Sequence, residues 1–273
     1  MKLNTKAIKR ALVINDMSCF GKCSLTVSLP IISSYGVECV PLPTAILSTH
    51  TGGFHEFTLL DMSDEIKNIT NHWSKIGLEF DCIYTGYFSK VDQIDFAIDF
   101  IKKNKKKDTL VVVDTVLGDN GKLYTGFNDE FVTAMKKLSK LADVITPNLT
   151  EAQFLTNEFE AEPKDLLDIL GTEKTVITGI KKGDKIGYLA KDGNHTFEID
   201  KKFYDIMLHG SGDVFASALV GEMMSGLEFE TAVENAAQFC EKAVEQTAKN
   251  CPEYNYGLMF EKVLLERIKN GNF

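Results

Sequence analysis

The sequence contains little of what a disulfide-stabilised, zinc-binding or membrane-spanning protein needs. Its six cysteines form no Cys-x-x-Cys pair and no Cys/His grouping at zinc spacing, which argues against a redox motif or a zinc site. No apolar run approaches the length of a membrane span, and the N-terminus lacks the apolar core of a signal peptide. We therefore expect a cytoplasmic protein with reduced thiols and no membrane partner.

Basic residues are also fewer than acidic residues. The chain has 30 Lys and Arg against 39 Asp and Glu, which gives a formal net charge of −9 at pH 7. This balance argues against nucleic acid as a partner, because contacts with a phosphate backbone need clustered positive charge. The one dense basic cluster, at residues 102–107, ends a segment of helical period and is typical of a solvated helix C-terminus. The charge balance therefore excludes nucleic acid from the expected partners.

Linkers, low-complexity tracts and internal repeats are absent as well. The chain has 273 residues, of which 44% are hydrophobic, so it can bury a large core. Because no Pro/Gly/Ser-rich boundary divides it, we expect residues 1–273 to form a single domain.

What the sequence does contain is an alternation of apolar, β-branched runs with segments of helical period. The predicted strands are residues 11–14, 37–41, 82–85, 109–114, 144–146 and 175–178. The predicted helices are residues 24–34, 63–76, 93–103, 129–141, 150–157, 212–225, 231–249 and 258–269. Strands this continuously apolar indicate an α/β fold, with a mostly parallel sheet covered by helices on both faces. Asp192-Gly193 separates two further strand-like runs, 185–190 and 195–199, and predicts an antiparallel hairpin extension.

The most informative motif is the run HGSGD at residues 209–213, which an apolar segment follows. Gly210 and Gly212 let the backbone turn tightly where a helix begins, and the first amides of that helix have no intrahelical partner. These amides form a site for an anion such as a phosphoryl group. Asp213 beside that site either caps the helix or accepts a proton from an attacking hydroxyl, as in a kinase. The late position of the motif and the lack of a Gly-Lys-Ser/Thr loop argue against a Rossmann dinucleotide site and a Walker phosphate loop.

Polar residues follow two of the predicted strands, at the sheet edge where ligands of open parallel sheets gather. Asp114 ends one strand, and Asn148, Thr150 and Glu151 follow the next one. Carboxylates at adjacent strand ends could hold Mg²⁺. Taken singly, Asp114 is equally a turn residue, and Thr150 and Glu151 are equally a helix cap and a first-turn acid. Their common edge favours a metal and nucleotide site.

A second polar group lies in the N-terminal third of the chain. Its side chains can hydrogen-bond a small polar substrate or, for the tyrosine, stack on a flat ring. The candidate substrate-binding residues are Asp16, Ser18, Thr44, His50, Thr51 and Tyr87. His50 is equally consistent with a structural histidine.

Together these motifs resemble the ribokinase-like superfamily and, within it, the bacterial pyridoxal/pyridoxamine (vitamin B6) kinases. The resemblance runs from about residue 10 to about residue 249. It rests on residues 14–21, 41–54, 114–124, 146–152 and 209–213. The last two segments are common to the superfamily, whereas the first two are similar to enzymes of vitamin B6 or of a related pyrimidine.

The resemblance implies a role for each matching residue. It makes Asp213 the catalytic base and places Gly210, Ser211 and Gly212 around the transferred phosphoryl group. The nucleotide-binding residues that it implies are Asp114, Thr146, Asn148, Glu151 and Thr178, with Asp114 and Glu151 as metal ligands. Asp16 and Thr51 match positions that contact the pyridine substrate. The resemblance further implies a three-layer ribokinase-like fold, ATP and Mg²⁺ with K⁺ as an additional candidate cation, and a homodimer.

Three positions depart from the family pattern. Thr115 stands where the family usually has proline, and Ser211 stands where threonine is more common. Asp16 lies where many pyridoxal kinases carry serine. Because a carboxylate there suits a ring N–H or an amine, the preferred form of the vitamin stays open.

The predicted function is ATP-dependent phosphorylation of the 5′-hydroxymethyl group of pyridoxal, pyridoxamine or pyridoxine. Two alternatives remain. A hydroxymethylpyrimidine (phosphate) kinase of thiamine synthesis shares the fold, the motifs and a hydroxymethyl acceptor. A B6-binding protein without catalysis shares the fold, but it would not need a base beside an anion site.

Overall fold

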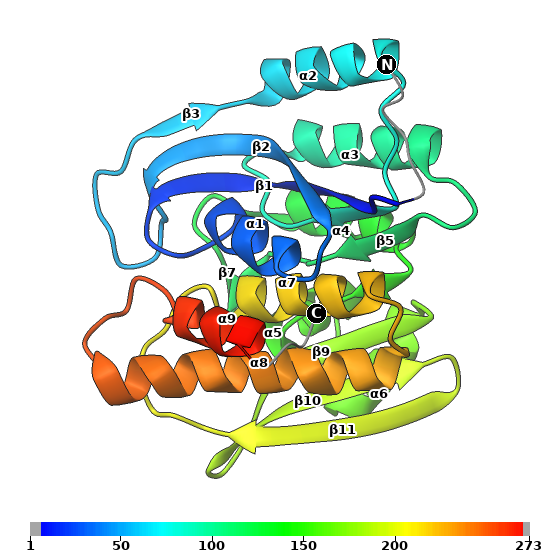
Figure 1. Cartoon of the computed structure of the whole chain (residues 1–273). Coiled ribbons are helices and arrows are strands. Elements are labelled where there is room, and N and C mark those ends of the chain that lie inside the picture. The colour runs from blue at the N-terminus through cyan, green and yellow to red at the C-terminus, as the bar shows by residue number, and fades with distance from the viewer. Residues whose placement is uncertain (1–6, 270–273) are drawn as a thin grey trace.

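A central sheet of nine strands organises the molecule, whose computed structural model describes residues 7–269. From one edge to the other, the strands are β11 (His195–Lys202), β10 (Lys185–Asp192), β9 (Lys174–Lys182), β8 (Val144–Ile145), β5 (Leu110–Val113), β4 (Cys82–Thr85), β1 (Arg10–Phe20), β2 (Glu38–Thr49) and β3 (Leu59–Asp61) (Figure 1). The strands from β9 to β2 pair in parallel. The pairs β9–β10, β10–β11 and β2–β3 are antiparallel. The predicted mostly parallel sheet with a hairpin extension is confirmed.

Helices cover both faces of this sheet. One face carries α1 (Leu25–Ser33), α7 (Ser211–Met224), α8 (Phe229–Asn250) and α9 (Phe260–Lys269). The other carries α2 (Ser63–Lys75), α3 (Val91–Asn104), α4 (Asp129–Ser139), α5 (Leu149–Thr156) and α6 (Pro163–Leu170). Within β1, Ala11 and Val13 belong to the core beneath α7, whereas Leu12 and Ile14 belong to the core beneath α3. Because successive side chains point to opposite faces, a strand buried on both sides needs the continuous apolar run that the sequence has.

Strands β1 and β2 extend beyond their predicted ends. The pairing continues through Asn15–Pro43 and Ser18–Leu47, with a register shift between Asn15 and Met17. The pairing of β1 with β4, in contrast, ends at Ile14. The prediction stopped too early because polar residues follow Ile14, and backbone pairing does not depend on their side chains. The extension carries Asp16 and Ser18 beyond the body of the sheet.

The sequence prediction also missed helix α6. This helix has eight residues, with Pro163 in its first turn and Gly171 in a left-handed conformation at its end. These are ordinary helix boundaries, but so short a segment offers few turns in which a helical period can be recognised.

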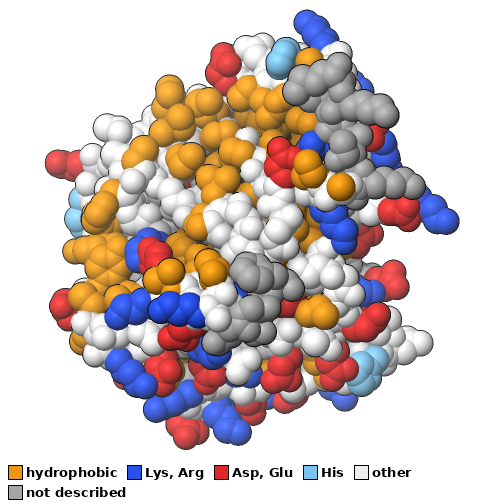
Figure 2. Space-filling view, viewed as in Figure 1, with side chains coloured by type: hydrophobic (Ala, Val, Ile, Leu, Met, Phe, Trp, Pro, Cys, Tyr) orange, Lys and Arg blue, Asp and Glu red, His pale blue; other side chains and the backbone are white. Residues whose placement is uncertain are grey.

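The face of the molecule drawn in Figure 2 carries an exposed apolar area. Figure 2 shows apolar side chains gathered over the upper part of this face, where β2 and β3 lie in Figure 1. Phe20, Leu59 and Leu60 are 53%, 43% and 60% exposed. Within the described part of the chain, no helix combines the length and the apolarity that crossing a membrane requires.

Candidate active site

The HGSGD run forms the start of helix α7, as predicted. Gly210 precedes the helix with a φ of 81°, a left-handed conformation that suits glycine. A side chain at this position would collide with the Lys22 carbonyl oxygen, so the loop before α1 packs directly against the glycine. The amides of Ser211, Gly212 and Asp213 open the helix and have no partner four residues earlier within it. The geometry of an anion site is therefore present.

Asp213 lies in the first turn of α7 and is partly buried. Its Oδ1 accepts a hydrogen bond of 3.3 Å from Asn15 Nδ2. Burial raises the pKa of Asp213 to about 6, and the nearby Asp16 contributes to the increase. A carboxyl group with such a pKa is ionised near neutral pH and accepts a proton more readily than an ordinary aspartate.

Asn15 connects Asp213 to the other side of the site. Its Oδ1 accepts hydrogen bonds from the backbone amides of Asp16, at 3.0 Å, and Tyr87, at 2.7 Å. The side chain is fully buried, and it fits only because Gly86 has no Cβ, which would overlap the Asn15 amide. No role was predicted for Asn15 from the sequence. Its position directly after the apolar part of β1, where a polar side chain reaches the edge of the sheet, is the sequence signal that could have identified it.

The extension of β1 brings two predicted acceptor-side residues together. Asp16 is 5% exposed, and its Oδ2 accepts a hydrogen bond of 2.9 Å from the hydroxyl of Ser18, which is fully buried. Burial raises the pKa of Asp16, although hydrogen bonds from the Ser24 and Ser18 side chains oppose the increase. A buried carboxylate of this kind favours a partner that carries a proton or a positive charge.

Thr44 and Tyr87 act as a pair. Thr44 Oγ1 donates a 2.9 Å hydrogen bond to the Tyr87 carbonyl oxygen, so its hydroxyl is already engaged within the protein. The backbone of Tyr87 is thereby held at both its N–H, by Asn15, and its C=O. Its ring stacks on Phe127 with 5.9 Å between centroids and 21° between planes. The backbone of Tyr87 is therefore fixed by two hydrogen bonds, and the role of the Thr44 hydroxyl is to hold the Tyr87 carbonyl.

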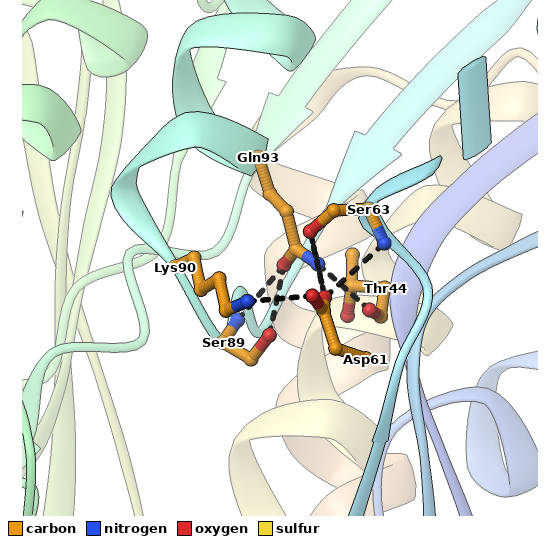
Figure 3. A network of polar contacts seen from close by, with 6 residues as sticks. All are labelled: Thr44, Asp61, Ser63, Ser89, Lys90 and Gln93. Atoms are coloured by element: carbon orange, nitrogen blue, oxygen red, sulfur yellow. Dashed lines mark hydrogen bonds and ion pairs between the residues drawn. The ribbon is translucent and has the colours of Figure 1, made fainter. Parts of the chain in front are cut away.

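A polar network supports Thr44 from behind (Figure 3). Gln93 Nε2 donates to the Thr44 carbonyl oxygen at 2.8 Å, to Asp61 Oδ1 at 3.0 Å and to Ser63 Oγ at 3.0 Å. Gln93 Oε1 accepts from the Ser89 amide at 3.0 Å. Gln93 is 1% exposed, so this one side chain joins β2, the start of α2 and the start of α3 without access to water.

Replacing Gln93 with alanine is expected to destabilise the fold. Buried acceptors and donors would lose their partner, which costs about 1–3 kcal/mol for each unsatisfied group. We expect the free energy of unfolding, measured by urea denaturation, to fall by about 2–4 kcal/mol. Lys90→Ala is the matched control, because it breaks only the exposed Lys90–Asp61 ion pair of the same network and should change stability little. Equal losses in the two variants would contradict the role given to Gln93.

His50 and His209 bring the loop after β2 against the anion site. Their ring centroids are 5.2 Å apart, and a side chain at Gly52 would overlap the His209 ring. His50 Nδ1 accepts a 3.2 Å hydrogen bond from the Gly52 amide, which fits the structural alternative for this histidine. Thr51 is exposed on the same loop. The role of both residues toward a substrate stays a prediction.

Asp114 and Thr146 lie on the other side of the anion site. Asp114 is 7% exposed, and its Oδ1 accepts a 3.2 Å hydrogen bond from Thr146 Oγ1. A Cβ on Gly212 would be 4.0 Å from Asp114 Oδ2, so this carboxyl group borders the anion site. Burial and the negative charges of Glu151 and Asp213 hold the pKa of Asp114 well above its usual range. A divalent cation beside Asp114 would relieve that repulsion, so the donor fits Mg²⁺.

Glu151 is placed differently. Its oxygens accept hydrogen bonds from Thr115 Oγ1 at 2.9 Å and from the amides of Leu117 and Asn148, each at 3.0 Å. Asn148 accepts in return from the Glu151 amide, which completes a capping box at the start of α5. Thr115, the departure from the family's proline, thus supplies a hydroxyl that holds Glu151. With its oxygens engaged in this way, Glu151 is suited to contact a metal through water.

The other residues predicted to bind the nucleotide, Asn148 and Thr178, lie at the same helix start. Asn148 Nδ2 donates to the carbonyl oxygen of Gly118 at 2.8 Å, which fixes the hairpin of β6 (Gly118–Asp119) and β7 (Lys122–Leu123) against α5. Thr178 on β9 forms an isolated bridge with Asn148. Among the described residues, no group of three or more His, Cys, Asp or Glu side chains could hold a metal ion. Kinase sites usually bind Mg²⁺ with one or two carboxylates and the substrate phosphates, so the assignment of Asp114 and Glu151 stays a prediction.

The comparison with known sequences decides the family. The profile of a family described as phosphomethylpyrimidine kinase matches residues 28–256. The chain belongs to this family.

Its relatives include enzymes of vitamin B6. A crystal structure from Bacteroides thetaiotaomicron, described as a candidate phosphomethylpyrimidine kinase with pyridoxal, is 36% identical, has a TM-score of 0.88 and covers 95% of each chain. The crystal structure of pyridoxal kinase from Lactobacillus plantarum is 29% identical, has a TM-score of 0.89 and covers 96% of this chain and 98% of that one. The pyridoxine kinase of Bacillus subtilis is 29% identical over 63% of this chain.

The family membership confirms the predicted ribokinase-like fold and the predicted kinase class. The chain spans between 43% and 66% of the lengths of the curated relatives from Bacillus subtilis and Arabidopsis thaliana that it matches. The roles of individual site residues stay predictions, whereas their relative positions are given by the structure. In that arrangement Asp213 lies between the Asp16–Tyr87 side and the Asp114 side.

Proposed function

We propose that this chain transfers the γ-phosphoryl group of ATP to the 5′-hydroxymethyl group of a B6 vitamer, that is, of pyridoxal, pyridoxamine or pyridoxine. The observation that carries the proposal is the position of Asn15, which contacts the carboxylate of Asp213 and the backbone of both Asp16 and Tyr87. One buried side chain thus ties the candidate base to the acceptor side. The other side of Asp213 adjoins the anion site of α7.

In this proposal Asp213 removes the proton of the acceptor hydroxyl. Asn15 donates a hydrogen bond to Oδ1, and an ionised carboxylate has further lone pairs with which to accept the proton. The hydroxyl oxygen then attacks the γ-phosphorus, the bond from that phosphorus to the bridging oxygen breaks, and ADP leaves. The raised pKa of Asp213 suits a group that must be ionised before the reaction and must hold a proton afterwards.

The first amides of α7 stabilise the charge on the transferred phosphoryl group. Gly210 allows them to approach an anion closely, and each donor in such a site typically contributes about 3–4 kcal/mol to transition-state stabilisation. Asp114 would hold Mg²⁺ directly and Glu151 would do so through water. When bound, the ion neutralises charge on the ATP phosphates.

On the acceptor side, Asp16 and Tyr87 would recognise the ring. The Asp16 carboxylate suits a pyridinium N–H or an amine, and the backbone of Tyr87 is fixed beside it. The pyridoxal found in the Bacteroides relative supports a pyridine acceptor. A hydroxymethylpyrimidine is the second candidate, because the family profile is that of phosphomethylpyrimidine kinases and this ring also carries a hydroxymethyl group.

Release of ADP with each acceptor separates the two candidates. The purified protein is assayed with ATP, Mg²⁺ and pyridoxal, pyridoxamine, pyridoxine or hydroxymethylpyrimidine, and kcat/KM is compared. We expect a B6 vitamer to give the highest value. A strong preference for the pyrimidine would replace the B6 assignment with the thiamine-related one.

The pKa of Asp213 predicts how the rate depends on pH. Because the carboxylate form is the active one, kcat/KM should rise with pH through about 6 and then level off. At pH 5 the rate should be about tenfold below the plateau, since about a tenth of Asp213 would be ionised. The profile of Asp16→Asn identifies the group: the inflection should persist without Asp16 but move to lower pH, because the charge of Asp16 contributes to the raised pKa of Asp213. A rate that stays level down to pH 5 would contradict the assignment of Asp213.

Three further properties belong to this proposal. K⁺ is an additional candidate cation, the assembly is a homodimer, and the location is the cytoplasm. The exposed apolar side chains of Phe20, Leu59 and Leu60 support an interface between copies.

A further inference from the structure

The connector between α8 and α9, residues 251–259, lies against the candidate active site. No role was predicted for it from the sequence. The half-buried ring of Tyr256 is 4.8 Å, centroid to centroid, from the ring of Phe54 in the loop after β2, and 5.9 Å from the ring of Phe20 at the end of β1. Figure 1 shows the connector beside the loop after β2, at the left of the view. Segments from opposite ends of the chain thus meet through aromatic rings.

The backbone of the connector holds the loop before α1. The Tyr256 carbonyl oxygen accepts a 2.7 Å hydrogen bond from the Lys22 amide, and a Cβ on Gly257 would overlap Lys22. The Lys22 carbonyl in turn packs against Gly210, the residue before the anion site. The Lys22 ammonium group also forms a 2.7 Å ion pair with Glu261 on α9. The connector therefore lies directly behind a loop that packs on the anion site.

Phe54 packs against the histidines beside the anion site. Its ring is 5.0 Å from the ring of His50, and the His50 ring is 5.2 Å from that of His209. These are the spacings of packed aromatic rings. A Cβ on Gly21 would overlap the His50 ring and be 3.3 Å from the Tyr256 carbonyl oxygen. The rings of the connector and of the loop after β2 thus continue, contact by contact, to the HGSGD run.

Hydrogen bonds do little to hold the loop after β2. Within the described part of the chain, residues 51–57 form one hydrogen bond, which the Gly52 amide donates to His50 Nδ1 in the same loop. Most of these residues are exposed. A segment with few hydrogen bonds and much exposed backbone opens easily unless side-chain packing holds it. The packing of Phe54 against Tyr256 is therefore the contact that can fix the loop in place.

We propose that Tyr256 is a positioning residue, whose ring holds the loop after β2 in place through Phe54. That loop carries His50 and Thr51, the predicted acceptor ligands next to the anion site. The proposal rests on the function proposed above, because it assigns this loop to the binding of the acceptor. The apparent dissociation constant of the acceptor then rises as the fraction of molecules with the loop in place falls. Because Tyr256 contacts no reacting atom, the chemical step itself should change little.

The first test removes the ring and then restores it. With the acceptor that the unmodified protein phosphorylates best, Tyr256→Ala should raise the KM of the acceptor about tenfold and leave kcat within about threefold. Tyr256→Phe keeps the ring and should keep both values within about twofold. An unchanged acceptor KM in Tyr256→Ala would overturn the proposal. An equal rise in Tyr256→Phe would overturn the role of the ring.

Tyr254 provides the matched control. It lies two residues earlier in the connector, and its ring packs edge-on against Tyr256 and lies beneath the Lys22 ammonium group. Tyr254→Ala therefore removes the same kind of side chain and leaves the Tyr256–Phe54 contact in place. It should leave the acceptor KM within about twofold, even where it lowers the urea midpoint. Equal rises of KM in the two alanine variants would mean that the connector acts only through stability, and the proposal would fail.

A variant on the other side of the contact tests whether Tyr256 acts through Phe54. Phe54→Ala removes the same ring contact from the loop. Because one contact cannot be lost twice, the double variant should have an acceptor KM within about threefold of that of Phe54→Ala alone. If the two increases in KM multiplied instead, the two residues would act independently, which would overturn the proposal.

Failure of this proposal can be distinguished from failure of the proposed function. If the unmodified protein phosphorylates no hydroxymethyl heterocycle, the proposed function fails. The contact is then tested without a substrate, by NMR-detected hydrogen exchange of the His50 and Gly52 amides, which donate to the Phe20 carbonyl oxygen and to His50 Nδ1. Their exchange should be about fivefold faster in Tyr256→Ala and unchanged in Tyr256→Phe. Unchanged exchange in Tyr256→Ala would reject the role of the ring.

Discussion

Replacing Asp213 with asparagine is expected to lower kcat by about 10²–10⁴-fold without unfolding the protein. The amide oxygen of asparagine can still accept the hydrogen bond from Asn15, but it cannot take the proton of the acceptor hydroxyl. Stability should not fall, because burial already disfavours the charged form of Asp213, as its raised pKa shows. The KM for ATP should change little, since the amides of α7 remain in place.

The measurement is steady-state ADP release, with thermal unfolding as the check on folding. Asp95→Asn is the matched control, because it makes the same chemical change at an exposed position on α3. This control should keep the rate of the unmodified protein. If Asp213→Asn kept more than about a third of that rate, Asp213 would not be the base.

Replacing Gly210 with alanine is expected to have the next largest effect. The residue has a φ of 81°, and the added Cβ would collide with the Lys22 carbonyl oxygen. Because neither backbone can yield without moving the start of α7, the anion-binding amides should be displaced. We expect kcat to fall by about 10²–10³-fold, as when a donor is removed from an oxyanion site. The free energy of unfolding should fall by about 2–5 kcal/mol, from left-handed strain and overpacking together.

Gly226 provides the control for this experiment. It lies just beyond the other end of α7 with a φ of 89°, and a Cβ there would meet no atom within 4 Å. Gly226→Ala should therefore cost about 1–2 kcal/mol of stability from the backbone alone and leave kcat unchanged. Similar losses of kcat in the two variants would mean that the position of the helix, rather than the anion site at its start, controls the rate.

Much of the fold follows from patterns that a sequence displays directly. A strand buried on both faces, such as β5, must be apolar throughout. Asp192-Gly193 predicted the hairpin, although its two turn residues are Gly193 and Asn194 and Asp192 still pairs with His195. The HGSGD run likewise predicts an anion site from local chemistry. The extension of β1 past Ile14 was not predictable in this way, because strand pairing there is decided by β2 rather than by the residues themselves.

The sequence predicted which residues form the candidate site, but not which of them face a ligand and which hold other residues in place. Thr44 has the residue type of a substrate ligand, yet its hydroxyl holds the carbonyl of Tyr87. Asn15 precedes the predicted substrate ligand Asp16 in the sequence and has no distinctive motif of its own, yet its side chain contacts Asp213 and the backbone of Tyr87. In each case the role depends on a contact between segments far apart in the chain, which spacing along the sequence does not encode.

The most direct test of the central claim follows the phosphoryl group itself. Pyridoxal, pyridoxamine and pyridoxine are each incubated with Mg²⁺ and ATP whose γ-phosphoryl group carries ¹⁸O, using the unmodified protein and Asp213→Asn in parallel. Mass spectrometry then measures the labelled phosphate ester. We predict that the unmodified protein forms pyridoxal 5′-phosphate carrying the label and that the variant forms it at least about 100-fold more slowly. Equal rates in the two proteins, or no labelled ester from pyridoxal, pyridoxamine or pyridoxine, would contradict the proposed function and its base.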